Sequence, residues 1–450
     1  MNADYAEFLA AKAVVAPMRG LADVPQLAGH LFAGQRHCVE FHLRAGSSGC
    51  FLDTGMGKTP IELEWAAHAA AASNGRALIL TPLAVARQIE AEGKRWGYRM
   101  RVIRNQEEAG EGINVCNYDR LELLDPSAFG AVALDESSIL KSWTGKTTRR
   151  LIETWASHRW RLAATATPAP NDHMELGTHA EFLGIMPMQD MLVRWFINDT
   201  ADTGTWRLKG HARQAFWDWM SSWSRMAEHP RDLGDDVPGF DLPPLEVIRH
   251  VSDEASHPFT AVRVSATEMF KIKRLTSETR ARITAELVAS DREPWVLWCD
   301  TNAEADALLA IVPDAGEVRG SDSIDEKEAT IAAFGDGSIR ALITKSSITG
   351  YGLNWQHCAR MAFVGRTFSY ENYYQAVRRC WRYGQKRPVQ VHLIVADGED
   401  AIGRVIDRKA DDHAAMKAEM VAAMRRNLGA GAALRVPYNP THFGRLPSWL

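Results

Sequence analysis

A run rich in glycine and ending in lysine and threonine, residues 51–59 (FLDTGMGKT), is the strongest chemical feature of the sequence. Gly55 and Gly57 allow the backbone to curl so that its N–H groups point inward toward an anion. Lys58 can place a positive charge beside the β and γ phosphates of a nucleotide, and the Thr59 hydroxyl can ligate Mg²⁺. We therefore predict a site for ATP and Mg²⁺ here, with a glycine-rich turn that binds nothing as the alternative.

Two adjacent carboxylates at the end of the apolar run 131–134 form a second candidate group. Neighbouring residues of a strand face opposite sides, so the two acids can do different work. We predict that Asp135 holds Mg²⁺, directly or through water, and that Glu136 is the general base for an attacking water. The alternative is an acidic pair that only caps the following turn.

Two arginines in residues 375–385 (QAVRRCWRYGQ) could stabilise the charge that develops on a γ-phosphate during hydrolysis. We expect a helix that starts near Ser369, so that Arg379 and Arg382, three positions apart, present two guanidinium groups on one face. Such a pair alone is usually a solvated helix face. The surrounding Q-A-x-x-R-x-x-R-x-G-Q pattern is far more specific.

Two further residues are candidates for contact with the nucleotide. Gln35 precedes the glycine-rich run by about twenty residues, and its amide could pair with both the donor and the acceptor of an adenine edge. An exposed surface glutamine is the alternative. Gly352 lies in a glycine-kinked loop, residues 349–354 (TGYGLN), that suits close approach to a backbone or a phosphate.

Short apolar runs alternate with helical patterns through the first half of the chain. The expected strands are 76–80, 113–116, 131–134 and 160–164, and the expected helices include 60–72 and 83–96. Repeated buried strands with polar residues at their C-terminal ends predict a parallel sheet whose ligand lies along that edge. Residues 184–234 then become helical and rich in aromatic side chains. We predict that these side chains are core, with base stacking as the alternative.

The clearest linker signal is the segment 238–244 (PGFDLPP). A second α/β lobe follows it. Its expected strands are 246–251, 295–299, 339–344, 361–364 and 389–395, and its expected helices are 258–290, 302–311, 325–334 and 401–428. We therefore predict an N-terminal lobe at 1–240, including the aromatic helical segment, and a C-terminal lobe at 241–450 that ends in a helix and a tail.

The composition is that of an ordinary globular protein, with 46% hydrophobic and 24% charged residues in a chain of 450. A net charge of −4 means that any nucleic-acid site must be a local basic groove. The six scattered cysteines form no C-x-x-C pair, which argues against zinc knuckles and disulfides and favours a reducing cytoplasm. Residues 1–12 do not have the pattern of a signal peptide, and no apolar run is long enough to span a membrane.

Several short motifs occur in a fixed order: Gln35, G-x-G-K-T at 55–59, Thr81-Pro82, D-E-S-S at 135–138, T-A-T-P at 165–168, G-x-G-L-N at 350–354 and the pattern at 375–385. This set resembles the superfamily-two DNA helicases and translocases. It looks closest to the Swi/Snf-like branch, in a compact form like those that bacteriophages encode. Leu52, which replaces the first glycine of a general phosphate-binding loop, is also typical of that family. The resemblance covers about residues 30–395 and assigns nothing to residues 396–450.

The resemblance implies an α/β fold of two tandem RecA-like parallel-sheet lobes, with an ATP site in the cleft between them and a helical insertion. The lysine loop and the acidic pair would form one half of the ATPase. The two arginines would form the other half, with Gln375 directed toward the γ-phosphate. Many relatives carry a histidine where Ser138 stands, so the connection from the acidic pair to the T-A-T motif is left open here.

The resemblance further implies ATP-driven movement along DNA, preferred over RNA, by a monomer or weak oligomer in the cytoplasm, or in that of the host if a phage encodes it. Contacts to the strand are expected near Thr81-Pro82, Asn117 and Ser346, from backbone amides and hydroxyls that bind phosphate without reading sequence. An RNA-directed helicase and an ATP-dependent clamp that does not turn over are alternatives. A metabolic phosphotransferase is disfavoured by the second lobe and its arginine pattern.

Overall fold

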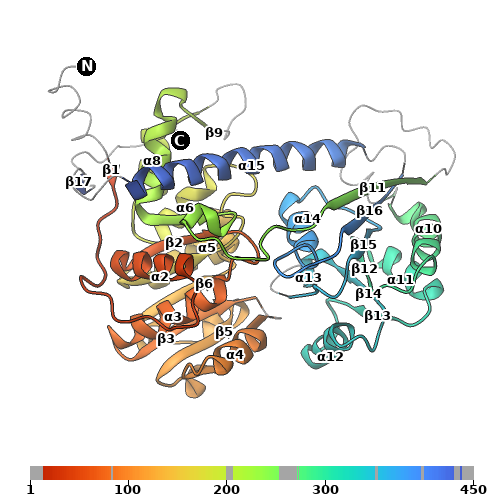
Figure 1. The fold of residues 1–450 in the computed structure, drawn as a ribbon, viewed down its shortest axis with the longest axis horizontal. Coiled ribbons are helices and arrows are strands. Elements are labelled where there is room, and N and C mark those ends of the chain that lie inside the picture. The colour runs from red at the N-terminus through yellow and green to blue at the C-terminus, as the bar shows by residue number, and fades with distance from the viewer. Residues whose placement is uncertain are drawn as a thin grey trace. The chain divides into compact units, whose positions relative to one another are not determined.

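The computed structural model describes residues 14–82, 85–198, 206–252, 271, 273–349, 353–396, 400–429 and 436–437. The chain divides into two compact units (Figure 1). Unit 1 comprises Met1–Val237 and His413–Leu450, and unit 2 comprises Pro238–Asp412. Each unit is built on one parallel β-sheet with helices around it, which confirms the predicted α/β fold with two parallel sheets.

Unit 1 contains a seven-stranded sheet in the order β10-β2-β7-β6-β3-β5-β4, and every pair in it is parallel. Its strands are β2 (Ser47–Leu52), β3 (Arg76–Thr81), β4 (Met100–Val102), β5 (Gly112–Asn117), β6 (Ala131–Asp135), β7 (Trp160–Ala164) and β10 (Ser224–Ala227). Because all strands run the same way, their C-terminal ends lie at one edge of the sheet. The lysine loop follows β2 and the acidic pair ends β6, so both belong to that edge.

Helices and 3-10 turns connect these strands. The α-helices are α2 (Ala33–Ala45), α3 (Lys58–Ala71), α4 (Ala86–Arg95), α5 (Lys146–Trp155), α6 (Glu175–Phe182), α7 (Met188–Trp195) and α8 (Arg213–Trp223). The 3-10 turns are η2 (Gln106–Glu108), η3 (Tyr118–Leu123), η4 (Pro126–Ala128), η5 (Ser137–Lys141), η6 (Gly210–Ala212) and η7 (Pro230–Leu233). Two small ribbons complete the set: antiparallel β8 (Phe196–Asn198) with β9 (Trp206–Leu208), and parallel β1 (Val14–Val15) with β17 (Val436–Pro437).

The strands predicted for the first half are present, but three strands of the seven-stranded sheet, β2, β4 and β10, were not predicted. β2 begins before the lysine run and includes the first two residues of that run, and all six residues of β2 are buried. The sequence of β2, SSGCFL, begins with residues that are typical of turns, which hides a strand that is covered on both faces. β10 lies within the segment that we predicted as helical, and its four residues follow α8 directly.

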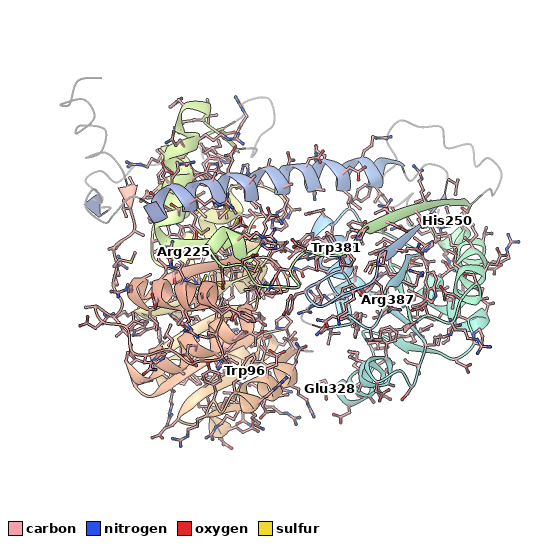
Figure 2. The ribbon with its side chains drawn as sticks, in the orientation of Figure 1. Trp96, Arg225, His250, Glu328, Trp381 and Arg387 are labelled. Atoms are coloured by element: carbon pink, nitrogen blue, oxygen red, sulfur yellow. The ribbon has the colours of Figure 1, made fainter. Side chains whose placement is uncertain are left out.

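Unit 2 contains a six-stranded parallel sheet in the order β11-β16-β15-β12-β14-β13. Its strands are β11 (Leu245–Ser252), β12 (Trp295–Cys299), β13 (Ala315–Val318), β14 (Ala341–Lys345), β15 (Arg360–Phe363) and β16 (Val389–Ala396). Its helices are α10 (Ser277–Ala289), α11 (Asn302–Ile311), α12 (Ile324–Gly335), α13 (Ser346–Thr349) and α14 (Tyr370–Val377). Residues 258–270 of the predicted helix 258–290 lie outside the described residues. On β11, His250 forms a 2.9 Å hydrogen bond with His392 of β16 (Figure 2).

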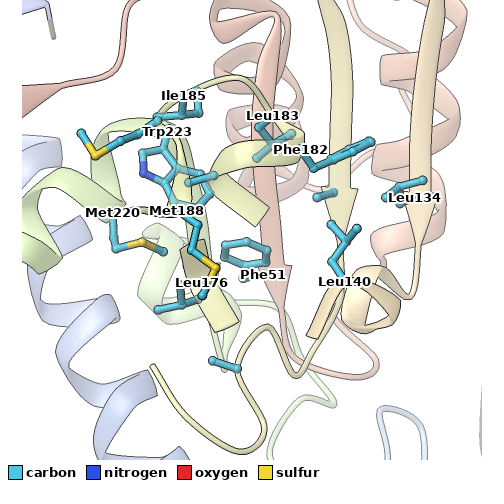
Figure 3. Close-up of a cluster of buried hydrophobic side chains, with 14 of the residues drawn as sticks. Phe51, Leu134, Leu140, Leu176, Phe182, Leu183, Ile185, Met188, Met220 and Trp223 are labelled. Atoms are coloured by element: carbon cyan, nitrogen blue, oxygen red, sulfur yellow. The ribbon is translucent and has the colours of Figure 1, made fainter. Parts of the chain in front are cut away.

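The aromatic segment 184–234 supplies core side chains to unit 1, which confirms the prediction of core over base stacking. Trp219 and Trp223 of α8 are almost completely buried, and so is Phe51 of β2. The Phe51 and Trp223 rings meet edge to face, with centroids 5.9 Å apart, among leucine and methionine side chains (Figure 3). This packing anchors the strand that leads into the lysine loop, because a fully buried aromatic side chain is costly to displace.

The last described helix, α15 (Asp400–Gly429), contributes to both units, since the division between them falls at Asp412 and His413. We predicted 241–450 as one lobe, whereas the structure groups the chain from His413 onward with unit 1. Ion pairs explain this grouping: Arg425 binds Asp232 at 2.7 Å and Arg426 binds Asp218 at 2.8 Å. Among the described residues, no helix is long and apolar enough to cross a membrane.

Candidate nucleotide-binding site

The lysine run forms a tight loop between β2 and the first turn of α3. Gly55 and Gly57 have φ values of 90° and 78°, in the left-handed region that only glycine adopts easily. α3 begins at Lys58, directly after the loop, so its free N–H groups and positive dipole end lie where a phosphate would bind. Lys58 Nζ donates to the carbonyl of Leu52 at 3.0 Å and to that of Asp53 at 3.4 Å. The lysine is therefore folded back across its own loop.

Gln35 lies in the first turn of α2 and is buried against this loop. Its Nε2 donates to the carbonyl of Met56 at 3.3 Å, and its Oε1 accepts from the backbone N–H of Phe32 at 3.0 Å. A Cβ atom at Gly57 would approach Gln35 Nε2 to 2.2 Å, so a larger residue there would displace the Gln35 amide. The alternative, an exposed surface glutamine, is thus wrong. The side-chain amide of Gln35 supports the loop by binding a backbone carbonyl of the loop.

Asp135 and Glu136 are directed toward different neighbours, as the strand geometry predicts. β3 lies beside β6, with Leu80 opposite Leu134. The next residues of the two strands, Thr81 and Asp135, are therefore also neighbours. The Thr81 hydroxyl donates to Asp135 Oδ2 at 2.8 Å. On the other side, the Thr165 hydroxyl donates to Glu136 Oε1 at 2.6 Å.

Glu136 occupies an unusual backbone conformation. Its φ of 57° lies in the left-handed region, which costs free energy in a residue that carries a side chain. Thr165 follows the last residue of β7, Ala164, which pairs with Asp135 in register. The hydroxyl that holds Glu136 is therefore positioned by the sheet itself. Thr167 contributes differently: its N–H donates to Thr165 Oγ1 at 3.1 Å, and its own hydroxyl has no hydrogen-bond partner among the described residues.

A histidine does reach the D-E-S-S segment, although the sequence has none within it. His179 of α6 is fully buried, and its Nδ1 lies 3.2 Å from the Glu175 carbonyl. A carbonyl can only accept, so Nδ1 carries the proton and Nε2 accepts from the Ser137 hydroxyl at 3.2 Å. Burial lowers the pKa of His179 to about 4. The imidazole is therefore neutral near pH 7, and the connection to the T-A-T motif runs through Thr165 instead.

Sequence reasoning missed two members of the site. Glu62 lies one turn after Lys58 on α3 and is only 1% exposed, and its Oε1 has no hydrogen-bond partner in the described part of the chain. Burial raises its pKa well above the usual range, with a further contribution from Asp135 that Lys58 opposes. The only signal in the sequence was the four-residue spacing from Lys58.

The second missed member is Tyr118, which follows β5. Its hydroxyl donates to the backbone carbonyl of Asp135 at 2.8 Å. Burial raises its pKa well above the usual range, and the charges of Asp135, Glu136 and Glu62 add to this effect. Tyr118 thus braces the acidic pair as a neutral phenol, next to a concentration of negative charge that a cation would relieve.

The residues present fit a Mg²⁺ site in which the protein supplies only some of the oxygen ligands. The described residues contain no group of three or more histidine, cysteine or acidic side chains arranged around a metal. Mg²⁺ is commonly held by one or two protein oxygens together with phosphate oxygens and water. Thr59 at the start of α3 and Asp135 at the end of β6 match that pattern, and the orphaned oxygen of the buried Glu62 is a further polar atom close to this acidic group.

In unit 2 the expected arginine helix is shorter than predicted. α14 ends at Val377, and the chain then turns, so Arg379 and Arg382 do not share a helical face as we predicted. The Gln385 side chain donates to the Cys380 carbonyl in this turn and to the carbonyls of Gln356 and Cys358, which ties the turn to the segment before β15. On this turn, Trp381 Nε1 donates to the Pro243 carbonyl at 2.8 Å (Figure 2).

The two arginines nevertheless converge. Arg379 Nη1 and Arg382 Nη1 each donate to the carbonyl of Leu353 at 3.0 Å. Arg379 Nη2 also donates to Gln375 Oε1 at 2.8 Å, and Gln375 is 1% exposed. The arginines are thus joined through one carbonyl of the G-x-G-L-N loop, in which Gly352 lies outside the described residues.

Of the residues predicted to contact nucleic acid, three lie together in unit 1 and the fourth, Ser346, belongs to unit 2. Thr81 is completely buried, and its hydroxyl donates to Asp135 and is not exposed on the surface. Asn117, its neighbour in register on β5, has a buried Oδ1 without a hydrogen-bond partner in the described regions. Pro82 follows Thr81 and is half-buried. Ser346 lies in unit 2, where it lines a depression with polar residues that include Asp300 and Arg366.

Comparison with known protein families finds a match in unit 2. Residues 279–384 match the helicase conserved C-terminal domain. This range runs from α10 to Gly384 and includes Gln375 and both arginines. Such a domain implies a helicase, an enzyme that uses ATP and acts on nucleic acid. No curated protein matches the chain.

Proposed function

We propose that this protein is an ATP-dependent DNA translocase or helicase of superfamily two, of the Swi/Snf-like kind, with Mg²⁺ as its cofactor. The observation that carries the proposal is the convergence of the lysine loop and the acidic pair at one edge of a parallel sheet. That edge holds a helix N-terminus, a lysine and two carboxylates with separate hydrogen-bond partners. The helicase C-terminal match in unit 2 supports the same reading.

Unit 1 supplies the residues that bind nucleotide. The loop N–H groups and the start of α3 bind the phosphates of ATP, and Lys58 leaves the Leu52 and Asp53 carbonyls to pair with them. Thr59 and Asp135 hold Mg²⁺, which when bound neutralises charge on the β and γ phosphates. Gln35 keeps the loop in shape through Met56 and retains one amide hydrogen for the adenine edge.

Glu136 is the general base in this proposal. Its side chain is fixed by the 2.6 Å hydrogen bond from Thr165, and its backbone is held in a left-handed conformation at the end of β6. A carboxylate fixed in this way can orient a water and accept its proton without the entropy cost of ordering a mobile side chain. The neighbouring acid, Asp135, remains on the Thr81 side and does separate work.

Unit 2 supplies Arg379 and Arg382, to which we assign stabilisation of the charge on the transferred phosphoryl group. Arg379 is held on three acceptors, among them the carbonyl and side chain of Gln375, and is therefore the more fixed of the two. Arg382 is half-buried, whereas Arg379 is only 3% exposed, so Arg382 can move to a phosphate at lower cost. We therefore assign the finger role to Arg382 and the positioning role to Arg379.

The test is the steady-state rate of ATP hydrolysis by the full chain, alone and with single-stranded DNA, duplex DNA, forked DNA and RNA. We expect stimulation by DNA, larger than that by RNA, and no hydrolysis by K58A. Stimulation by duplex without strand displacement indicates translocation on duplex, and displacement of a labelled strand from the fork indicates unwinding. Hydrolysis that no nucleic acid stimulates would exclude the proposal, and binding without any phosphate release would point to a clamp.

A further inference from the structure

Lys417 of α15 lies at the same sheet edge as the phosphate-binding loop, although its position in the sequence gives no reason to expect this. Its Nζ lies 2.5 Å from Glu228 Oε1 and 3.6 Å from Asp53 Oδ2. Lys417 and Asp53 are each only 9% exposed, so the two charges interact in a poorly solvated region. All three residues belong to unit 1.

The two acceptors of Lys417 come from adjacent strands. Asp53 directly follows β2 and Glu228 directly follows β10, and these strands are parallel with Leu52 opposite Ala227. The Asp53 N–H donates to the Ala227 carbonyl at 2.9 Å, which keeps the two strand ends in register. Lys417 therefore bridges the two C-terminal strand ends at the point where the phosphate-binding loop begins.

Asp53 transmits this contact to the loop. Its Oδ1 accepts from the Thr54 N–H at 2.7 Å, and its carbonyl accepts from the Met56 N–H at 3.2 Å and from Lys58 Nζ at 3.4 Å. The position of Asp53 thus sets the start of the curl that presents the loop N–H groups. Its carboxylate also brings a negative charge close to the place where phosphates bind, and this charge weakens nucleotide binding unless a cation offsets it.

Lys417 is the cation suited to that task. His413, one turn earlier on α15, is buried near the same pair, and burial together with Lys417 lowers its pKa to about 3, so it is neutral at pH 7. The other ion pairs of this part of α15, such as Arg425 with Asp232, involve residues outside the loop. Lys417 is therefore chemically distinct among the charged side chains of the helix.

We propose that Lys417 is a positioning residue for the phosphate-binding loop, through which α15 sets the affinity of the protein for nucleotide. This inference rests on the proposed ATPase function. Without Lys417, the Asp53 carboxylate keeps its charge next to the phosphates and the start of the loop loses a fixed contact. Lys417 touches neither water nor phosphate in the reaction, so its loss weakens binding and leaves turnover at saturating ATP largely unchanged.

The experiment measures the dissociation constant of a fluorescent ATP analogue, and the KM and kcat of ATP hydrolysis, on the full chain. We expect K417M to weaken binding and raise KM by roughly tenfold, with kcat within about twofold of the unmodified protein. K417R restores the affinity because it restores the charge. R425M is the matched control: it removes a cation from the same helix, and we expect it to leave nucleotide affinity unchanged.

A double-mutant cycle asks whether the effect passes through Asp53. Asparagine keeps the acceptor for the Thr54 N–H but carries no charge, so K417M should not change affinity further in a D53N background. If K417M proves unstable in thermal unfolding, K417Q, which can still bind Glu228, takes its place. The inference would be overturned if K417M bound nucleotide as tightly as the unmodified protein. It would also be overturned if K417M weakened nucleotide binding equally in the unmodified and D53N backgrounds. Absence of nucleotide binding by the unmodified protein would overturn the proposed function instead.

Discussion

Replacement of Thr165 by valine removes one hydroxyl from the site while nearly preserving side-chain shape. The lost hydrogen bond is the 2.6 Å contact to Glu136 Oε1, made by a residue that is completely buried. A hydrogen bond to a charged group contributes about 1.5–3 kcal/mol. If Glu136 needs this contact in the transition state, kcat for ATP hydrolysis falls by about 10- to 150-fold, and KM changes little.

The assay is steady-state ATP hydrolysis at saturating nucleic acid, with nucleotide affinity measured separately. T165S keeps the hydroxyl and should retain most of the activity. T167V is the matched control, because Thr167 is equally buried on the same loop but its hydroxyl has no hydrogen-bond partner among the described residues. T165V also removes the acceptor of the Thr167 N–H, so its thermal stability must be measured to separate misfolding from lost catalysis.

A kcat for folded T165V within about twofold of the unmodified protein would refute the role given to Thr165, since even the lower bound of the hydrogen-bond energy predicts a larger change. Equal losses in T165V and T167V would be just as damaging. They would indicate general disturbance of the loop after β7 and not a specific contact with the base.

Three other outcomes are expected. K58A should abolish ATP binding and hydrolysis, because it removes the charge that pairs with the phosphates; retained hydrolysis would mean that the loop is not the nucleotide site. R382A should bind nucleotide normally but turn over about 10³-fold or more slowly in a single-turnover assay, whereas full activity would disprove the arginine-finger role. The pKa of His179 is about 4 in the folded protein and 6.5 in the unfolded chain. Between these values the unfolded state binds more protons, so the free energy of unfolding falls as the pH drops from about 6.5 to about 4. H179Q should therefore lose less stability between pH 7 and pH 4.5, by up to about 2.5 kcal/mol in urea unfolding, and an unchanged pH dependence would contradict the assignment.

Local patterns in the sequence were sufficient to identify the lysine loop and most strands. Gly55 and Gly57 predicted a left-handed curl because few other residues adopt that backbone, and both have positive φ values. Apolar runs such as 131–134 and 295–299 predicted buried parallel strands, and both are present. These features depend on residues that are close together in the chain, which is why pattern and propensity can reveal them.

Interactions between distant segments could not be inferred in this way. The arginine pattern predicted a helical face, but α14 ends at Val377, before both arginines, and their side chains converge instead on the Leu353 carbonyl. Thr81 was predicted to contact a nucleic-acid strand, but the pairing of β3 with β6 brings its hydroxyl to Asp135. β2 was hidden by turn-forming residues that burial on both faces overrides.

The sequence by itself determined which groups could do chemistry: a phosphate-binding loop, an acidic pair and two arginines in a specific pattern. Only the tertiary structure decided what holds them. The register of β6 and β7 brings the Thr165 hydroxyl to Glu136, and α3 brings the buried Glu62 close to Lys58 and Asp135. The register of β2 and β10 brings Asp53 and Glu228 within reach of Lys417. Sheet register and helix docking are set by packing over the whole unit, and so no local pattern records them.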